Sequence, residues 1–419
     1  MELANDFSDK QLRAATNNNL GRLLMLRGDY FGANRYLQNA VKLYQSTGNQ
    51  EGIAEVFGNL GNLYFRRGQY EEAEKYFEDS IEIARRIEGF PLDAQIVANL
   101  GLTHMDRGSY EEGIRYQQEQ LELCRAHNDK QGMATMFTYL GIVFLEKGDY
   151  DSALSSFRQG LELSNELGNK QLTSIAIGNI GIVYERKGDY VRAMENYVKD
   201  LELCEELGDK LGTAIALGLI GQLLNIQGEF HKAIEYPQKD LMLCEELGYQ
   251  KGIAKALNTL GDIFFNLQQF QRSLHFYNRA IEVTRAINNK LVLGFSLVEK
   301  GTVLLELSDW VELEKVVGEA LEVATELGNP DLGFEARLLS AKVYFARQDQ
   351  STAKEILYYL LGLNLSPDQE AAVYYEFYRL NPADTTSRDK AFQLYQQLFK
   401  ITPRYLYKLR LGILERSIS

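Results

Sequence analysis

The sequence predicts an all-α protein, a right-handed α-solenoid of antiparallel helix pairs. Two observations lead to this fold class. Glycine recurs every 40 residues along most of the chain, and each 40-residue unit contains two stretches in which apolar residues follow helical spacing. Self-similarity at a fixed period is the sequence signature of repeat proteins, whose units stack on their neighbours. We therefore expect the 419 residues to form stacked units rather than separate globular domains.

The first helix of each unit carries a glycine near its centre. Leu or Ile precedes this glycine in the first seven units. A small residue follows twelve positions later on the second helix, as in Ala33, Ala73 and Ala153. Both positions lack a large side chain where the paired helices approach closely, and larger residues there would hold the helices apart. The glycines are Gly21, Gly61, Gly101, Gly141, Gly181, Gly221, Gly261 and Gly301.

A second glycine series marks the turn between the two helices of a unit. Glycine can adopt the left-handed conformation that ends a helix, and an aspartate directly after it, such as Asp29, Asp149 or Asp189, can cap the next helix. An aromatic residue stands two positions after each glycine of this series, as Tyr30 does after Gly28. Leu-Gly-Asp or Leu-Gly-Asn sequences at 167–169, 207–209 and 327–329 predict a similar end for the second helix. The series is Gly28, Gly68, Gly108, Gly148, Gly188 and Gly228, replaced by Gln268 and Ser308 in the next two units.

The repeat pattern divides the chain into three parts. Residues 10–328 hold eight 40-residue units, 329–361 a degenerate ninth unit, and 362–419 a C-terminal capping repeat and helix. Pro237 stands inside the second helix of the sixth unit, where other units have an aromatic residue. An interior proline costs ~3 kcal/mol and kinks a helix, so we expect a local bend of the superhelix there.

The unit resembles that of the tetratricopeptide repeat (TPR) family, which has a Leu-Gly pair, an aromatic residue three positions later, and a small residue and an aromatic on the second helix. Leu60-Gly61, Tyr64, Ala73 and Phe77 match this pattern. The 40-residue length and the phrases GNLGNLY and LGDKLG resemble the variant found in Pins-type G-protein signalling modulators and in bacterial signalling TPR regions. The resemblance implies a TPR superhelix whose first helices line a concave binding groove.

Charge and hydropathy exclude several classes of function. The chain has 45 Lys and Arg against 58 Asp and Glu, a net charge of −13, which makes nucleic acid a poor partner. No apolar stretch approaches the ~18 residues of a membrane helix, and the N-terminus lacks a signal-peptide pattern. Three cysteines, Cys124, Cys204 and Cys244, form no CxxC pair and share one repeat position, so we expect free thiols in the core. A cytoplasmic protein without membrane insertion fits these features.

No pattern of catalytic or metal-binding residues occurs in the sequence. His104 takes the place of a core aromatic, the other three histidines lie in different units, and no pair of histidines has metal-ligand spacing. Phosphate-loop, dinucleotide, HExxH and GxSxG motifs are all missing. We therefore expect no enzymatic activity, no catalytic residue, no cofactor and no metal.

The helical phase predicts which side of the first helices forms the groove. At 100° per residue, unit positions 17, 20, 21, 24 and 28 share the packed side, and positions 15, 19, 22 and 26 lie opposite. Amides there could read a peptide backbone, or could bond to neighbouring helices. Apolar residues there could bind a partner, or pack against the second helices. The candidate groove residues are Asn19, Asn59, Asn62, Asn99, Leu102, Tyr139, Ile142, Asn179, Ile182, Leu219 and Gln222.

These features predict a non-enzymatic interaction scaffold or regulatory subunit in intracellular signalling. It would bind a peptide or helical segment of a partner protein in its concave groove. One alternative is an oligomerising structural protein in which residues 405–414, rich in Tyr, Leu and Ile, pair two chains. Another is a ligand-sensing module that acts on a separate enzyme. The oligomeric state stays open, with a monomer favoured.

Overall fold

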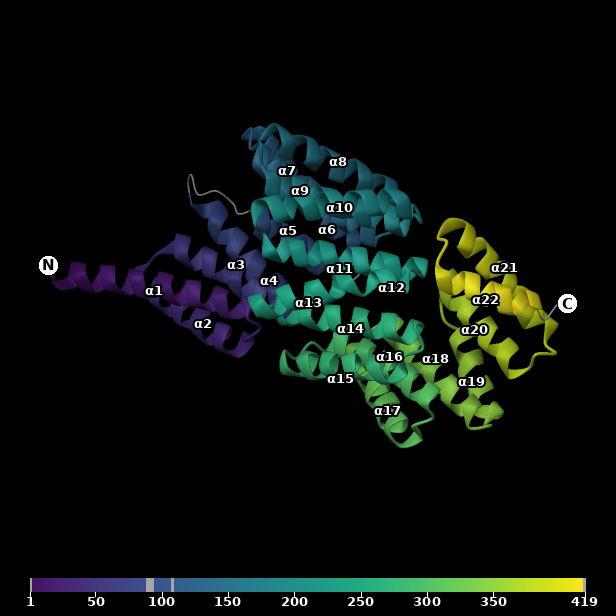
Figure 1. Ribbon diagram of the computed structural model, residues 1–419. Coiled ribbons are helices and arrows are strands. Elements are labelled where there is room, and N and C mark those ends of the chain that lie inside the picture. The colour runs from purple at the N-terminus through teal and green to yellow at the C-terminus, as the bar shows by residue number, and fades with distance from the viewer. Residues whose placement is uncertain (1, 88–93, 107–108, 417–419) are drawn as a thin grey trace. The chain divides into compact units, whose positions relative to one another are not determined.

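The computed structural model describes residues 2–87, 94–106 and 109–416, and this part of the chain is helical without a strand (Figure 1). The expected turn glycine Gly108 lies outside the described residues. The helices are α1 (Glu2–Leu26), α2 (Tyr30–Thr47), α3 (Gln50–Arg66), α4 (Tyr70–Arg86), α5 (Ala94–Asp106), α6 (Tyr110–Ala126), α7 (Lys130–Glu146), α8 (Tyr150–Glu166), α9 (Lys170–Arg186), α10 (Tyr190–Leu207), α11 (Lys210–Gln227), α12 (Phe230–Ala233), α13 (Glu235–Leu247), α14 (Gln250–Asn266), α15 (Phe270–Ala286), α16 (Lys290–Leu307), α17 (Trp310–Leu327), α18 (Pro330–Ala346), α19 (Gln350–Leu361), α20 (Pro367–Leu380), α21 (Thr385–Ile401) and α22 (Tyr405–Arg416).

Consecutive helices pack as antiparallel pairs, because turns of only a few residues connect helices that lie against each other along their length. The pairs α1 with α2, α3 with α4, α7 with α8 and α14 with α15 are examples. Within each unit neighbouring pairs pack on one another, as α2 does on α3 and α15 does on α16. The predicted fold class, an all-α solenoid of helix pairs, is confirmed.

The chain forms two compact units. Unit 1 comprises residues 1–183 and 195–212, and unit 2 comprises residues 184–194 and 213–419. Within unit 1, α1 contacts α3, α3 contacts α5 and α5 contacts α7. Within unit 2, α14 contacts α16, α16 contacts α18 and α18 contacts α20. Helices on the inside of a curved stack lie closest together, so the first helices form the inner layer of each unit. No helix in the described ranges is long and apolar enough to cross a membrane.

The glycines at the centre of the first helices make room for large side chains of the second helices. A Cβ atom on Gly61 would lie 2.5 Å from the Phe77 ring, and one on Gly261 would lie 2.6 Å from the Tyr277 ring. The same relation joins Gly141 to Phe157. These rings are almost fully buried. The expected role of the glycines in close helix approach is therefore confirmed.

The turns follow the predicted chemistry. Gly68 and Gly188 have φ values of 71° and 77°, in the left-handed region that favours glycine. The carboxylate of Asp29 accepts a hydrogen bond from the Gly32 amide at 2.8 Å and so caps α2. Gln268 adopts the left-handed conformation as well, with φ of 58°, although its side chain makes that conformation less favourable than it is for glycine.

Pro237 interrupts the second helix of the sixth repeat. The helix is divided at Ile234 into α12 and α13, and the hydrogen bond from the Gln238 amide to the Ile234 carbonyl is long, at 3.4 Å. The proline ring fills the space that an aromatic ring fills elsewhere, since a Cβ on Gly221 would lie 2.7 Å from its Cδ. Ile234 keeps right-handed helical dihedrals, and the expected bend of the superhelix stays a prediction.

Candidate functional site

The amides of the predicted groove bridge neighbouring first helices in unit 1. The Asn59 side chain donates a hydrogen bond to the Asn18 side-chain oxygen at 2.8 Å, which joins α3 to α1. Asn99 donates to the Asn62 oxygen at 2.5 Å, which joins α5 to α3. These two bonds favour the structural interpretation of the amides, because part of their hydrogen-bonding capacity is used inside the protein.

Two further candidate amides behave differently. Asn179 donates to the Ile175 carbonyl within its own helix, α9, at 2.8 Å. Asn19 is exposed on α1. In unit 2, Gln222 on α11 donates to the Thr259 hydroxyl on α14 at 3.3 Å. Bonds between neighbouring first helices thus involve Asn59, Asn62 and Asn99 in unit 1 and Gln222 in unit 2, whereas Asn179 bonds within its own helix. Each of these bonded amides remains partly accessible to solvent.

Apolar side chains continue the inner face of unit 1 along α5, α7 and α9. Leu102, Tyr139, Ile142 and Ile182 are half-buried, and Ile175 is 43% exposed. Leu102 and Tyr139 pack with one side against the core of the third and fourth repeats. The row therefore has a packed side and an accessible side, as an apolar contact surface would.

Leu219 departs from the expectation of an accessible side chain. It is only 9% exposed and belongs to the core of unit 2. Its helix, α11, has buried apolar residues on most of its circumference. A helix that is apolar on most sides packs against neighbours on more than one side, and Leu219 is buried for this reason. The helical phase was correct for its neighbour Ile215, which is 47% exposed.

The inner face of unit 2 carries charged side chains that the sequence interpretation missed. They occupy the same unit positions, 15, 19 and 22, in the seventh to ninth repeats, so the phase argument could have found them. These residues are Lys255 and Asp262 on α14, Glu299 on α16, and Glu335 and Lys342 on α18.

The carboxylates of this charged face influence one another. Burial raises the pKa of Asp262, whose carboxylate accepts a hydrogen bond from the Tyr277 hydroxyl at 2.5 Å. The Glu299 side chain is accessible to solvent but surrounded by protein on this inner face, and this desolvation raises its pKa. The negative charges of Asp262 and Glu335 raise the pKa of Glu299 further. A cation brought to this face would relieve the repulsion.

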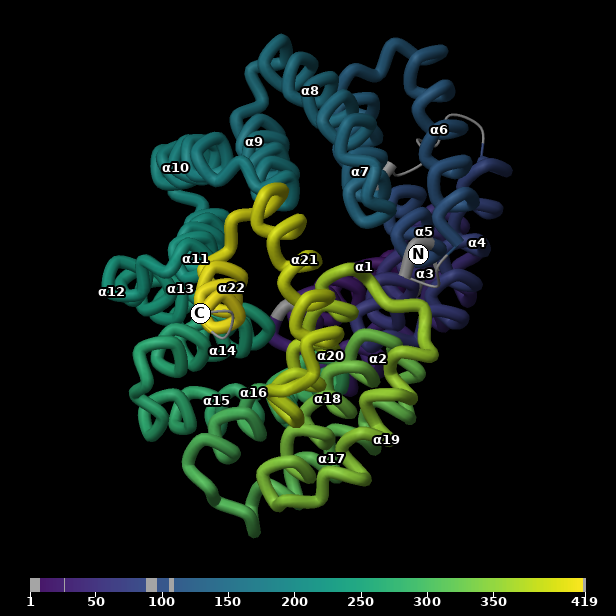
Figure 2. Tube along the Cα trace, turned by 90° about the vertical axis from the view of Figure 1, so that its right-hand side faces the viewer, coloured from purple at the N-terminus to yellow at the C-terminus, as the bar shows by residue number. Residues whose placement is uncertain are grey.

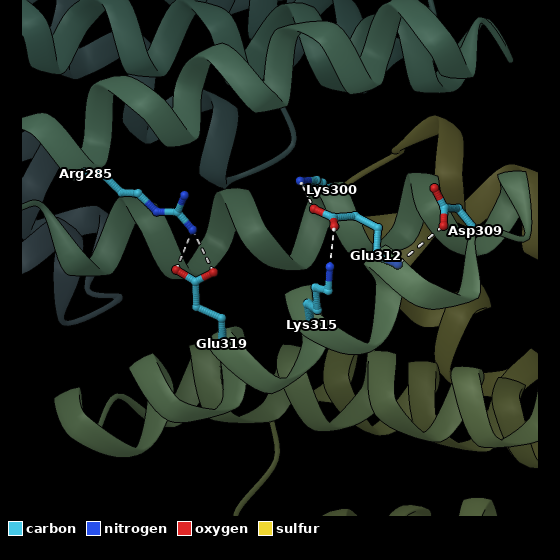
Figure 3. A network of polar contacts seen from close by, with 6 residues as sticks. All are labelled: Arg285, Lys300, Asp309, Glu312, Lys315 and Glu319. Atoms are coloured by element: carbon cyan, nitrogen blue, oxygen red, sulfur yellow. Dashed lines mark hydrogen bonds and ion pairs between the residues drawn. The ribbon is translucent and has the colours of Figure 1, made fainter.

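A second charged network lies between α15, α16 and α17 (Figure 3). The Lys300 ammonium, with a side chain only 12% exposed, contacts the Glu312 carboxylate at 2.9 Å, and Lys315 approaches the same carboxylate. The Arg285 guanidinium donates two hydrogen bonds of 2.7 Å to Glu319. Asp309 accepts from the Glu312 amide and caps α17. The bonds of Lys300 and Arg285 join α16 and α15 to α17, and the Asp309 cap closes the start of α17, so the network has a structural role.

Comparison with known families agrees with this architecture. The profile described as "Tetratricopeptide repeat" matches residues 12–86, 93–166 and 172–239, and related profiles of the same description match 59–126 and 254–287. The chain belongs to the tetratricopeptide repeat family. A comparison with curated protein sequences finds no match.

Solved structures share the TPR fold at low sequence identity. Aspartyl phosphate phosphatase F from Bacillus subtilis has a TM-score of 0.54 and 14% identity, covering 87% of this chain and 94% of that one. NprR in complex with its cognate peptide NprX has a TM-score of 0.54 and 12% identity, covering 82% and 97%. The human IFIT1 dimer with m7Gppp-AAAA has a TM-score of 0.53 and 13% identity, covering 97% and 89%.

The cysteines of this TPR protein are free and buried, as expected. Burial raises the pKa of Cys204 to about 11, and it raises the pKa of Cys244 as well, where the Asp240 carboxylate adds to the effect. A thiol with a raised pKa is a poor nucleophile at neutral pH. Among the described residues, no group of three His, Cys, Asp or Glu side chains could hold a metal ion.

Proposed function

We propose that this TPR protein is a non-enzymatic interaction scaffold or regulatory subunit of intracellular, cytoplasmic signalling. It binds a peptide or helical segment of a partner protein on the inner face of unit 1. The observation that supports this most is the accessible apolar row on α5, α7 and α9, with amides beside it on α1, α3 and α9. The binding residues would be Asn19, Asn59, Asn62, Asn99, Leu102, Tyr139, Ile142, Asn179 and Ile182.

The chemistry of this face suits one kind of ligand. Half-exposed aliphatic side chains on successive first helices provide separate apolar contacts, which the side chains of an amphipathic helix or an extended peptide can fill. The amides beside them keep hydrogen-bonding atoms at the surface, where a peptide backbone could meet them. Because much of that capacity is already used in bonds such as Asn59 to Asn18, we assign the larger share of affinity to the apolar row.

Solved TPR structures give this proposal a precedent and an alternative. NprR was solved with its cognate peptide, which fits a peptide ligand here. IFIT1 was solved with m7Gppp-AAAA, so the fold also accommodates RNA. The net charge of −13 disfavours RNA for this chain, because a polyanion would meet repulsion rather than basic side chains.

Selection from a displayed library of random peptides tests the proposal without a known partner. Peptides selected on the full-length chain are measured by titration against a variant with Ile142→Asp and Ile182→Asp. A matched control carries Phe31→Asp, since Phe31 is an 84% exposed apolar residue on a second helix of the same unit. Circular dichroism establishes that all three chains are equally folded.

Loss of binding in the double variant, with binding retained in the control, is the expected result. Two buried charges in an apolar contact should weaken binding at least about a hundredfold, or about 2.7 kcal/mol. Equal binding by all three chains would show that the inner face of unit 1 is not the binding surface.

One observation favours oligomerisation as a second candidate function. On α22, Leu406, Leu409 and Ile413 are 46%, 47% and 40% exposed and share one helix face, while Tyr407 and Leu414 are buried on the other. An accessible apolar stripe of this kind could pair with a second copy. Sedimentation of the wild type and of Leu409→Glu distinguishes the two states, since a monomer in both excludes the pairing.

A further inference from the structure

The connection between α21 and α22 docks on two turns of unit 2 that are more than 170 residues away in the chain. A Cβ atom on Gly188, in the turn before α10, would lie 2.0 Å from the Ile401 carbonyl oxygen and 2.9 Å from the Thr402 Cα. A Cβ on Gly228, in the turn before α12, would lie 2.6 Å from the Tyr405 ring. The chain thus touches the bare faces of two turn glycines. Figure 2 shows α21 and α22 returning towards α11.

Contact of this kind is confined to these two turns among the left-handed glycines whose surroundings the structure describes. A Cβ on any of seven others would meet no atom within 4 Å. The seven are Gly48, Gly68, Gly148, Gly168, Gly208, Gly248 and Gly328. The left-handed conformation accounts for glycine in all nine turns. At Gly188 and Gly228 the absence of a side chain also leaves the space that the docked segment occupies.

The aromatic residues after the two turns are covered by the same segment. Tyr190 is 7% exposed and Phe230 is 9% exposed. The Phe230 and Tyr405 rings lie 5.0 Å apart at an interplanar angle of 88°, an edge-to-face contact, and the Arg404 guanidinium faces the Tyr190 hydroxyl. Aromatic residues at the same position in other repeats are only half-buried: Tyr30, Tyr70, Tyr110, Tyr150, Phe270 and Trp310.

The docked segment is basic in an acidic protein. Residues 401–416, the connection together with α22, contain four Lys and Arg and one Glu, a net charge of 4 − 1 = +3, whereas the whole chain has −13. Arg404 lies near Asp368, and Arg410 lies near Glu376 and Glu335 of the inner face of unit 2. Opposite charges therefore help to hold α22 and the residue before it beside α20 and α18.

The contact is small enough to open. Ile401 is 64% exposed and Tyr405 is 38% exposed although both touch the turns. The apolar cluster that contains Tyr407 and Leu414 is formed by α20, α21 and α22, and neither Tyr190 nor Phe230 belongs to it. Separation of the segment from the two turns would leave that cluster intact.

We propose that residues 401–405, with α22, form a latch that holds unit 2 in one curvature by docking in cis on the turns at Gly188 and Gly228. Each repeat of a solenoid contacts mainly its neighbours, so small changes between repeats add up to a change of curvature. A contact between the two ends of unit 2 removes this freedom. Opening of the latch uncovers Tyr190 and Phe230.

Glycine-to-alanine substitutions provide a matched test on the full-length chain. The latch variant carries Gly188→Ala and Gly228→Ala. The control carries Gly148→Ala and Gly248→Ala, which impose the same left-handed strain on turns with open surroundings. A second latch variant, Tyr405→Ser, leaves all turns unchanged. Limited trypsin cleavage after Lys400 and Arg404, followed by mass spectrometry, reports docking, and X-ray scattering in solution reports the radius of gyration.

The latch predicts cleavage about tenfold faster in both latch variants, which corresponds to about 1.4 kcal/mol of lost docking, together with a larger radius of gyration. The control should match the wild type in both measurements. Equal acceleration in the control, or no acceleration in the latch variants, would overturn the docking. Faster cleavage without a change in scattering would overturn the restraint on curvature. Wild-type cleavage that slows with rising protein concentration would overturn docking in cis.

Discussion

The inner faces of the two units differ in chemistry although the repeats that carry them are built alike. In unit 1 the first helices present amides and aliphatic side chains, such as Asn59 and Ile142. In unit 2, α14, α16 and α18 present charged groups, such as Asp262, Glu299 and Lys342. Both units place a glycine opposite a large second-helix residue, and both have left-handed residues in turns, such as Gly68 in unit 1 and Gln268 in unit 2.

This difference separates the residues that make the solenoid from those that give it a function. The packed positions repeat because every helix pair faces the same steric problem. The inner positions face solvent or a ligand and can vary without loss of the fold. The partner proposed for unit 1 would therefore contribute apolar side chains, and a ligand on the inner face of unit 2 would have to contribute positive charge.

The largest effect on stability is expected at Lys300 of unit 2. This lysine directly precedes the glycine of its first helix, where the first seven repeats have Leu or Ile. Glu312→Ala would leave the Lys300 ammonium without its 2.9 Å partner, at a cost of about 2 to 3 kcal/mol. Lys300→Leu should be neutral or stabilising, because it removes both the charge and its desolvation. Urea unfolding followed by circular dichroism measures both.

The same pair predicts a pH dependence. Hydrogen bonding to Lys300 lowers the pKa of Glu312 below its ordinary value of 4.5. The stability that the pair contributes is therefore fully present above pH 4.5 and is lost as the pH falls through the lowered value. An acid titration of Lys300→Leu that shows the same loss as the wild type would contradict this assignment.

Two equivalent buried aspartates compare the units directly. Burial raises the pKa of Asp240 in unit 2 to about 6. Burial also raises the pKa of Asp200 in unit 1, but the hydrogen bond that its carboxylate accepts from Ser174 opposes this rise. The folded state binds a proton at Asp240 more tightly than the unfolded state, so stability falls as the pH rises from about 4 to about 6. We expect Asp240→Asn to remove this fall and to stabilise the protein at pH 8 by about 2 kcal/mol.

Asp200→Asn serves as the comparison for that experiment. Its effect at pH 8 should be smaller, because the Ser174 hydroxyl already stabilises the charged form. Thermal unfolding at pH 5 and pH 8 provides the measurement. Equal shifts in the two variants would show that the difference between the two sites has no energetic consequence.

Gln117 is the corresponding irregularity of unit 1. It is fully buried on α6, neither side-chain amide atom has a hydrogen-bond partner, and it fills the space that Phe77 and Phe157 fill in the flanking repeats. An unsatisfied buried polar group costs about 1 to 3 kcal/mol, so Gln117→Phe should raise the free energy of unfolding by about 1 to 2 kcal/mol. A denaturation midpoint that falls instead would mean that the ring does not fit beside Gly101.

The smallest effect concerns the turns of unit 2 that lack glycine. Gln268 has φ of 58°, and Gln268→Gly should stabilise the protein by about 0.5 to 1 kcal/mol because glycine adopts this conformation without steric cost. The opposite change in unit 1, Gly68→Gln, should destabilise it by a similar amount, since the turn is otherwise open. Thermal midpoints of both variants measure the pair.

Sequence periodicity predicted most of the fold. The glycine and aromatic positions gave the helix pairs, and the Asp-after-Gly pattern gave caps such as Asp29, because these features depend on contacts within one unit or between adjacent ones. Docking of Tyr405 on Phe230 was beyond reach of the sequence, since it joins residues far apart in the chain and has no periodic signal.

The candidate site was predicted less completely. Ile142 and Ile182, which helical phase placed on the groove side, are half-buried, but phase could not show that Asn59 and Asn99 bond to neighbouring helices, or that Leu219 is buried. Phase gives the direction of a side chain from its own helix, and its burial depends on what the next helix places opposite. Asp262 and Glu299 occupy unit positions 22 and 19, which the same phase assigns to the groove side. They were missed because the prediction relied on amide and apolar residues at these positions and left out charged ones.

Hydrogen exchange of the full-length chain with and without a peptide selected on it tests the central claim most directly. If the inner face of unit 1 is the binding surface, the peptide should slow exchange in α5, α7 and α9, and the variant with Ile142→Asp and Ile182→Asp should show no change on addition of the same peptide. Protection confined to second helices, or to α14, α16 and α18, would contradict the claim and would place the binding surface elsewhere.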